Sequence, residues 1–178
     1  TKNQKEIINE IDKDLCSDFK MFRLLQGDVG SGKTIVSFIS AGNVIRSGWQ
    51  VALMAPTEIL AKQHFGLAKK VFGSTNISIK FLTGKTNFKE KRLIKDKLIS
   101  GKINFLIGTH ALFQKDTLFK KLGLVIIDEQ HKFGVRQRKL LSDKGGKNCD
   151  ILLMSATPIP RTLTMTLYGD MDLSIIRE

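Results

Sequence analysis

The sequence predicts an α/β protein: a three-layer sandwich in which helices cover both faces of a mostly parallel central sheet. Apolar, strand-like segments alternate with helix-like segments along the chain, and this alternation builds βαβ units with parallel strands. The apolar run at residues 124–127 contains no polar residue, which is typical of a strand buried on both faces. In such folds, ligands bind at the carboxyl ends of the strands.

Each element is predicted from its local pattern. We expect strands at residues 21–26, 51–55, 77–82, 103–107, 122–127 and 151–154. We expect helices at residues 33–46, 57–72, 87–99 and about 162–168. Thr57 is the expected N-cap of the second helix, and Glu58 suits its first turn. Because no repeat, low-complexity tract or linker interrupts the 178 residues, they form a single expected domain.

Composition narrows the class of protein. The formal net charge is +12, from 29 basic and 17 acidic residues, which favours a polyanionic partner such as nucleic acid, although lysines also coat solvated surfaces. Cys16 and Cys149 match no metal or redox spacing, so we expect reduced thiols. No apolar run is long enough to span a bilayer, and the first residues lack the apolar core of a signal peptide. We therefore expect a cytoplasmic protein without a membrane partner.

A phosphate-binding motif stands between the first expected strand and the first expected helix. The pattern G-x-x-x-x-G-K-[ST] is matched in full by Gly27, Asp28, Val29, Gly30, Ser31, Gly32, Lys33 and Thr34. Its glycines let the backbone approach phosphate, and successive N–H groups form an anion site at the helix N-terminus. Lys33 is expected to reach the β and γ phosphates, and the Thr34 hydroxyl is expected to bind Mg²⁺.

Two acids complete the predicted nucleotide chemistry. Asp128 directly follows the apolar strand at residues 122–127, where the metal-binding aspartate of a P-loop enzyme stands. A carboxylate at Glu129 is placed to orient and deprotonate the water that attacks the γ-phosphate. The sequence thus predicts ATP and Mg²⁺ as cofactors, with Lys33, Asp128 and Glu129 as the catalytic residues.

Four short motifs resemble those of superfamily-two helicases, in the same order. Residues 128–131 (Asp-Glu-Gln-His) resemble the DExH motif, and residues 155–157 (Ser-Ala-Thr) resemble the motif that links hydrolysis to DNA movement. Residues 55–58 and 108–110 resemble motifs that contact DNA. The resemblance covers essentially the whole chain and implies a RecA-like P-loop NTPase lobe, in which His131, Ser155 and Thr157 couple ATP hydrolysis to movement.

Longer stretches narrow the resemblance to the RecG family of DNA helicases. They are residues 22–34, 128–138 and 156–163. The transcription-repair coupling factor shares much of this pattern but usually has Glu where Gln130 stands and Phe where Ser31 stands. Lys132 departs from the arginine common in RecG proteins, and lysine lacks the bidentate fork of arginine. The same lobe of the coupling factor remains the alternative.

The resemblance also implies roles for scattered residues. Gln4 resembles the residue that recognises adenine, through an amide that both donates and accepts. DNA-backbone contacts are implied for Pro56, Thr57, Thr83, Gly84, Lys85, Thr109 and His110. His64 has no metal partner at a useful spacing, so a structural role is expected for it.

The implied whole protein is an ATP-dependent, double-stranded DNA helicase that remodels stalled forks and recombination junctions. It is expected to be a monomer. This chain is its first motor lobe, without the second lobe, which supplies an arginine finger, and without the wedge domain. A nucleotide-binding switch without motor activity does not need Glu129, and a small-molecule kinase fits residues 155–157 and the basic charge poorly. Junction preference and polarity do not follow from the sequence.

Overall fold

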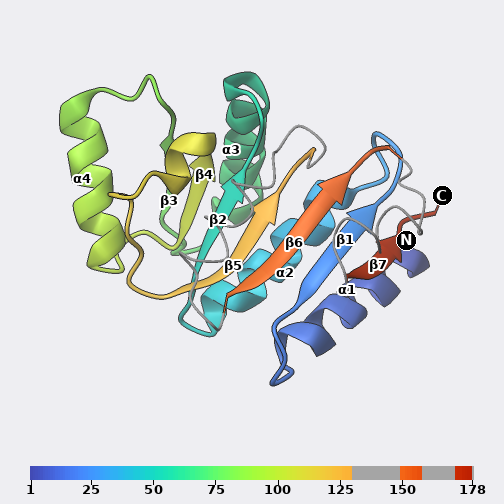
Figure 1. Ribbon diagram of the computed structural model, residues 1–178. Coiled ribbons are helices and arrows are strands. Elements are labelled where there is room, and N and C mark those ends of the chain that lie inside the picture. The colour runs from blue at the N-terminus through green and yellow to red at the C-terminus, as the bar shows by residue number, and fades with distance from the viewer. Residues whose placement is uncertain (130–148, 158–170, 178) are drawn as a thin grey trace.

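A computed structural model describes residues 1–129, 149–157 and 171–177 of the chain. Helices and strands alternate along these residues, as the apolar pattern predicts (Figure 1). In chain order they are α1 (Lys2–Leu15), β1 (Phe22–Gln26), α2 (Lys33–Arg46), β2 (Gln50–Met54), α3 (Glu58–Phe72), β3 (Ile79–Leu82), α4 (Phe88–Ile99), β4 (Phe105–Gly108), the 3-10 helix η1 (His110–Phe113), β5 (Leu122–Ile127), β6 (Asp150–Ser155) and β7 (Asp172–Ile175).

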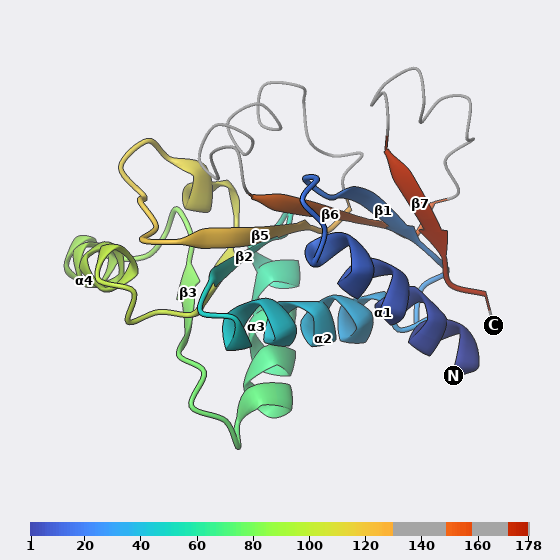
Figure 2. The ribbon, with the colours of Figure 1, turned by 90° about the horizontal axis from the view of Figure 1, so that it is seen from below.

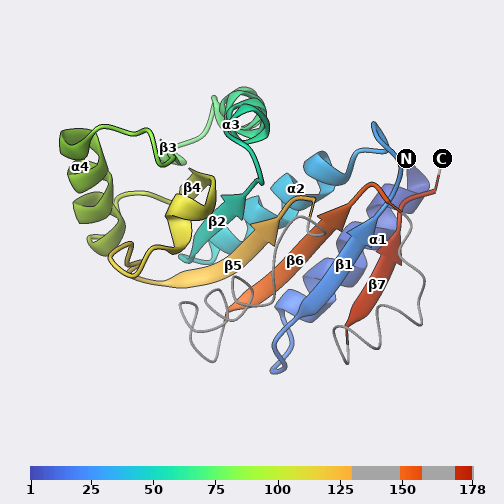
Figure 3. The same cartoon turned by 45° about the horizontal axis from the view of Figure 1, so that its top comes forward.

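The described strands form one sheet with parallel neighbours throughout. Its seven strands lie in the order β3-β4-β2-β5-β6-β1-β7. Because the strands point the same way, their carboxyl ends lie along one edge, as the arrowheads of β2, β5, β6 and β1 show in Figure 3. The parallel sheet predicted from the sequence is confirmed, and this edge is where ligands bind in such folds.

Alternate residues of the central strands enter two different cores, one on each face of the sheet. In β5, Leu124 and Ile126 pack into the core formed with α1, α2 and α3, whereas Val125 and Ile127 pack into the core that includes residues of α4 and η1. Figure 2 shows α1, α2 and α3 together on one side of the sheet. Every residue of β5 is buried, which explains its unbroken apolar sequence and confirms the three-layer prediction.

The predicted elements agree with the observed ones to within two residues wherever the structure describes them. The predicted bounds of α2 and β5 match fully. The predicted N-cap of α3 is also confirmed, because the hydroxyl of Thr57 accepts a hydrogen bond from the Leu60 N–H at 3.3 Å. The helix expected near residues 162–168 lies outside the described residues.

Helix α1 was not predicted, although its start carries a recognisable signal. The Thr1 hydroxyl accepts from the Gln4 N–H, and the Gln4 side chain accepts from the Thr1 amine, which together form a capping box. Ile7 and Ile11, one turn apart, are buried in the core shared with α2. The Thr-x-x-Gln spacing followed by this apolar stripe is the signal that predicts the helix.

Strand β7 and the helix η1 were also missed. Strand β7 is only four residues long, and it pairs with β1, which lies near the other end of the chain. The Arg177 N–H donates to Oδ1 of Asn3 at 2.9 Å, so the last described residues lie beside the first (Figure 1). No local sequence pattern announces a contact over such a separation.

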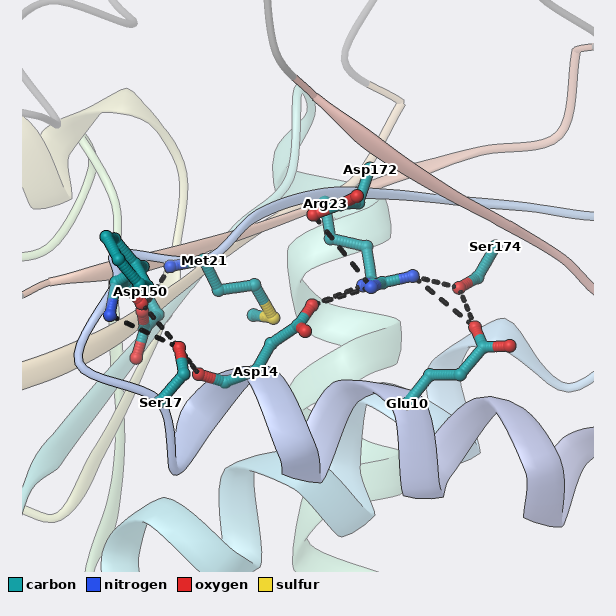
Figure 4. Close-up of polar contacts among 9 residues, drawn as sticks. Glu10, Asp14, Ser17, Met21, Arg23, Asp150, Asp172 and Ser174 are labelled. Carbon is teal, nitrogen blue, oxygen red and sulfur yellow. Dashed lines mark hydrogen bonds and ion pairs between the residues drawn. The ribbon is translucent and has the colours of Figure 1, made fainter.

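A buried arginine joins α1, β1 and β7 (Figure 4). Nε of Arg23 lies 2.8 Å from Oδ2 of Asp14, and one of its terminal nitrogens lies 2.6 Å from the same oxygen. The other terminal nitrogen donates to Oγ of Ser174 at 2.6 Å and lies 3.4 Å from Oε2 of Glu10. The Ser174 hydroxyl in turn donates to Glu10 at 2.6 Å. One guanidinium thus ties the first helix to an outer strand of the sheet.

The two cysteines differ in exposure. Cys16 is exposed and Cys149 is buried, and both are free. Burial raises the pKa of the Cys149 thiol to about 12, so it stays protonated at neutral pH. None of the described helices combines the length and apolar character needed to cross a bilayer.

The first prediction concerns the Arg23 cluster. We expect Arg23→Leu to lower the free energy of unfolding by about 2–3 kcal/mol, because it leaves the carboxylates of Glu10, Asp14 and Asp172 without their cation. This is below the roughly 3–5 kcal/mol of a fully buried pair, since the side chain of Asp14 is 28% exposed. The measurement is urea denaturation followed by circular dichroism.

Lys85→Ala is the matched control, because it breaks the exposed Lys85–Glu58 pair, whose nitrogen and oxygen lie 3.2 Å apart. Exposed pairs contribute at most about 1 kcal/mol. Equal losses in the two variants would contradict the role given to Arg23.

Candidate nucleotide and nucleic-acid site

The phosphate-binding loop lies between the end of β1 and the start of α2, as predicted. Gly30 and Gly32 have φ angles of 88° and 92°, a conformation that side chains rarely adopt. A Cβ atom on Gly32 would also lie 2.3 Å from Nε2 of Gln4, so this flexible side chain would have to move, but the backbone angle is the main reason for glycine there. The loop leads into the N-terminus of the 14-residue helix α2, where backbone N–H groups can bind a phosphate.

Lys33 lies over this loop. Its ammonium donates hydrogen bonds to the carbonyl oxygens of Gly27 at 2.6 Å and Asp28 at 2.7 Å. Burial lowers the pKa of the Lys33 ammonium, and the nearby carboxylates of Asp128, Glu129 and Asp28 act in the opposite direction. Lys33 therefore lies within electrostatic range of Asp128 and Glu129, the two acids that are predicted to be catalytic.

Asp128 and Glu129 leave β5 in a fixed geometry. The backbone N–H of Asp128 still bonds the Met54 carbonyl of the neighbouring strand at 2.9 Å, and its carboxylate accepts from the Glu129 N–H at 2.9 Å. Glu129 has a φ of 50°, the one positive value at a non-glycine position among the described residues. Such backbone strain costs of order 1–3 kcal/mol and is concentrated at functional sites.

His64, on α3, contacts the carboxylate of Asp128. Its Nε2 lies 2.6 Å from Oδ2 of Asp128, and both side chains are largely buried. Only a structural role is predicted for His64 from the sequence, because no metal partner stands at a useful spacing from it. A buried imidazole does need a polar partner, and no spacing rule could name Asp128.

Ser155 and Thr157, predicted to couple hydrolysis to movement, lie at the end of β6. The Ser155 hydroxyl lies 3.0 Å from the Thr157 hydroxyl, and the Thr157 N–H donates back to Ser155 Oγ at 3.2 Å. The Ser155 carbonyl accepts from the Gly27 N–H at 3.2 Å, so this motif touches the start of the phosphate loop. The third predicted coupling residue, His131, lies outside the described residues.

Thr34 and Asp128 are the predicted Mg²⁺ ligands. In nucleotide sites Mg²⁺ binds one or two protein oxygens together with phosphates and waters, so a hydroxyl and one carboxylate form a suitable set. The part of the chain that the structure describes holds no cluster of three metal-binding side chains that would make a separate cage. The buried hydroxyl of Ser31, in the phosphate loop, has no hydrogen-bond partner among the described residues. The oxygens of Thr34 and Asp128 fit a metal that is bound jointly with a nucleotide.

Gln4, predicted to recognise adenine, lies against the phosphate loop. Its Nε2 donates to the Ser31 carbonyl at 2.8 Å, while its Oε1 accepts from the Thr1 amine at 2.9 Å. The structure therefore places this amide beside the nucleotide loop, at the start of α1. Recognition of adenine through it stays a prediction.

The predicted DNA-contact residues follow β2, β3 and β4. They divide by exposure: Thr57, Gly84, Lys85 and His110 are exposed, Pro56 is half-buried, and Thr83 and Thr109 are buried. The backbone N–H of Thr83 donates to Thr86 Oγ1 at 3.0 Å. The exposed members therefore offer the accessible surface, and the contacts themselves stay predictions.

The strand order determines where these groups lie along the side of the sheet that is formed by the carboxyl ends of its strands. The loops after β3, β4 and β2 come first, then Asp128 and Glu129 after β5, then Ser155 after β6 and the phosphate loop after β1. The predicted nucleic-acid residues thus occupy one half of the edge and the nucleotide loop occupies the other. The two acids lie between them.

Comparison with known proteins agrees with this arrangement. Residues 1–166 match the family model of DEAD/DEAH box helicases. The chain is 49% identical over its whole length to the ATP-dependent DNA helicase RecG of Treponema pallidum and 51% identical to that of Aquifex aeolicus, of which it covers 27% and 23%. It therefore spans about a quarter of the length of these curated relatives.

A solved structure of RecG bound to a three-way DNA junction matches 99% of the chain and 24% of the RecG chain, with a TM-score of 0.86 and 45% identity. A DEAD box protein from Methanococcus jannaschii, at 19% identity and a TM-score of 0.71, shares the fold. The RecA-like assignment is confirmed, and the chain belongs to the DEAD/DEAH box helicase family.

Proposed function

We propose that this chain is the ATP-binding motor lobe of an ATP-dependent DNA helicase that remodels branched DNA. The observation that carries the proposal is the meeting of the phosphate loop with two acids at one sheet edge, where Lys33 lies in the field of Asp128 and Glu129. Identity of 49–51% to RecG proteins across the whole chain supports the substrate class.

Each residue has a distinct task in the proposed reaction. The loop N–H groups and Lys33 bind and orient the phosphates of ATP. Thr34 and Asp128 would hold Mg²⁺, which would supply positive charge to the phosphates. Glu129 takes the proton of the attacking water. Ser155, which touches both Thr157 and the first residue of the loop, is placed to transmit the state of the site along the sheet edge.

DNA binds, in this proposal, at the exposed residues after β2, β3 and β4. A hydroxyl, a glycine backbone, a lysine and a histidine suit phosphate contact without base readout. The excess of 12 positive charges adds sequence-independent attraction. A three-way junction, the DNA bound in the solved RecG structure, is the natural first substrate to test.

The remaining parts are proposed to lie elsewhere in the full-length protein. They are a second motor lobe, which closes over the nucleotide and supplies an arginine finger, and a wedge domain that engages the branch. We propose that the protein acts as a monomer in the cytoplasm. The equivalent lobe of the transcription-repair coupling factor is the weaker candidate, because the relatives cited above, which match the whole of this chain, are RecG proteins.

The second prediction separates binding from hydrolysis in the full-length protein. Lys33→Ala should abolish ATP binding or turnover, because it removes the cation at the β and γ phosphates. Glu129→Gln should bind ATP normally but lose at least about tenfold in turnover, because the amide cannot accept a proton. Fluorescent-nucleotide titration and a DNA-stimulated ATPase assay measure the two steps.

The control for the carboxylate-to-amide change is Asp96→Asn, on the exposed face of α4. It should leave both steps unchanged. Near-normal hydrolysis by a folded Lys33→Ala protein would refute the assignment of the loop, and near-normal hydrolysis by Glu129→Gln would assign the water to another residue.

The third prediction concerns the DNA surface. Lys85→Gln in the full-length protein should weaken binding about equally for unrelated DNA sequences. It should also lower the slope of log K against log salt by about 0.9, the contribution of one phosphate contact. Lys102→Gln is the matched control, because this exposed lysine lies just before β4, at the opposite edge of the sheet. The proposed contact between Lys85 and a DNA phosphate would be contradicted if Lys85→Gln changed the preference among DNA sequences. It would also be contradicted if the two variants had equal salt slopes.

The fourth prediction tests the need for a second lobe. Residues 1–178 alone should bind ATP but hydrolyse it about 10³-fold more slowly than the full-length protein, and should not unwind a fork. Charge on the γ-phosphate calls for an arginine finger, which contributes roughly 10³–10⁵ in rate in related enzymes. Turnover equal to that of the full-length protein would show that these 178 residues carry their own finger.

A further inference from the structure

His64 lies outside the motifs that define the nucleotide site, but it contacts Asp128, which belongs to one of them. Nε2 of His64 lies 2.6 Å from Oδ2 of Asp128, which is a short hydrogen bond. A metal-binding carboxylate is ionised and only accepts hydrogen bonds, so the imidazole must donate through Nε2. The donor comes from α3, and the acceptor comes from the end of β5.

Each oxygen of the Asp128 carboxylate thereby has its own donor. Oδ2 accepts from His64, and Oδ1 accepts from the backbone N–H of Glu129 at 2.9 Å. Two donors on different elements fix both torsion angles of a short side chain. Each oxygen keeps a further lone pair for a metal or a metal-bound water.

The imidazole itself is held in place. His64 is 8% exposed, and its ring packs edge-on against Phe38 of α2, with centroids 6.5 Å apart. Phe38 is fully buried between Phe72 and Phe105. The His64 ring therefore packs against the hydrophobic core, which restrains its orientation and supports its hydrogen bond to the carboxylate.

We propose that His64 is a positioning residue for the metal site: it orients the Asp128 carboxylate so that Mg²⁺ and nucleotide bind together. The inference rests on the proposed function, because it takes Asp128 as the metal carboxylate. Partners that orient a ligating carboxylate typically change metal affinity or activity by about 10–100-fold when they are replaced.

The test compares two amides at position 64 in the full-length protein. In His64→Gln the side-chain amide N–H can reach about as far as Nε2 of the histidine and can still donate to Asp128. In His64→Asn the side chain is one methylene shorter, so its amide N–H falls short of Asp128. Binding of fluorescent ADP is titrated with Mg²⁺ and again with EDTA. We expect His64→Asn to lose about 10–100-fold of the gain in affinity that Mg²⁺ provides, with EDTA values unchanged, and His64→Gln to keep most of that gain.

Two further variants separate positioning from packing. Phe105→Leu disturbs the same core at a ring that packs against Phe38 rather than against His64, so it should lower the melting temperature but keep the Mg²⁺ gain. In a protein that already carries Asp128→Ala, adding His64→Asn should change the Mg²⁺ gain no further, because the histidine acts through the carboxylate.

An unchanged Mg²⁺ gain in His64→Asn would overturn the positioning role while leaving the proposed function intact. Equal loss in the asparagine and glutamine variants, or equal weakening with Mg²⁺ and EDTA, would show a purely structural role and overturn it as well. If the wild-type protein bound no nucleotide in Mg²⁺, the proposed function would fail, and this inference would fail with it.

Discussion

The hydrogen-bond ladder of the parallel sheet continues one residue past the carboxyl end of several strands, and the site depends on that continuation. The N–H groups of Gly27, Ala55, Thr109 and Asp128 all donate to carbonyls of neighbouring strands at 2.9–3.3 Å. Each of these residues begins or adjoins a predicted functional motif. The motifs are therefore anchored to the most buried part of the fold, which limits their motion relative to one another.

What could be predicted from the sequence is mostly local. The phosphate loop needs positive φ angles at particular glycines, and Asp128 must follow a buried strand, so both can be recognised within a few residues. The bounds of α2 and β5 follow from apolar periodicity in the same way. The prediction of the nucleotide residues needed no knowledge of which strands are neighbours.

What the sequence could not show depends on pairs of residues that are distant along the chain. His64 becomes interpretable only when α3 is seen beside the end of β5, and Arg23 only when β7 is seen beside β1. Strand β7 is short and exposed along part of its length, so its own residues carry little signal. Helix α1 is the exception, because the capping box from Thr1 to Gln4 was visible and was missed.

The charges around the phosphate loop bear on the proposed need for a metal and for a second lobe. Among the described residues, Lys33 faces the carboxylates of Asp28, Asp128 and Glu129, and the start of α2 adds the equivalent of about half a positive charge. That balance is negative before any phosphate arrives. In the proposed function two of these acids are required, since Asp128 would hold the metal and Glu129 would serve the water. The proposal therefore assigns the offsetting positive charge to Mg²⁺ and to an arginine of the proposed second lobe, and it expects hydrolysis when the two lobes close.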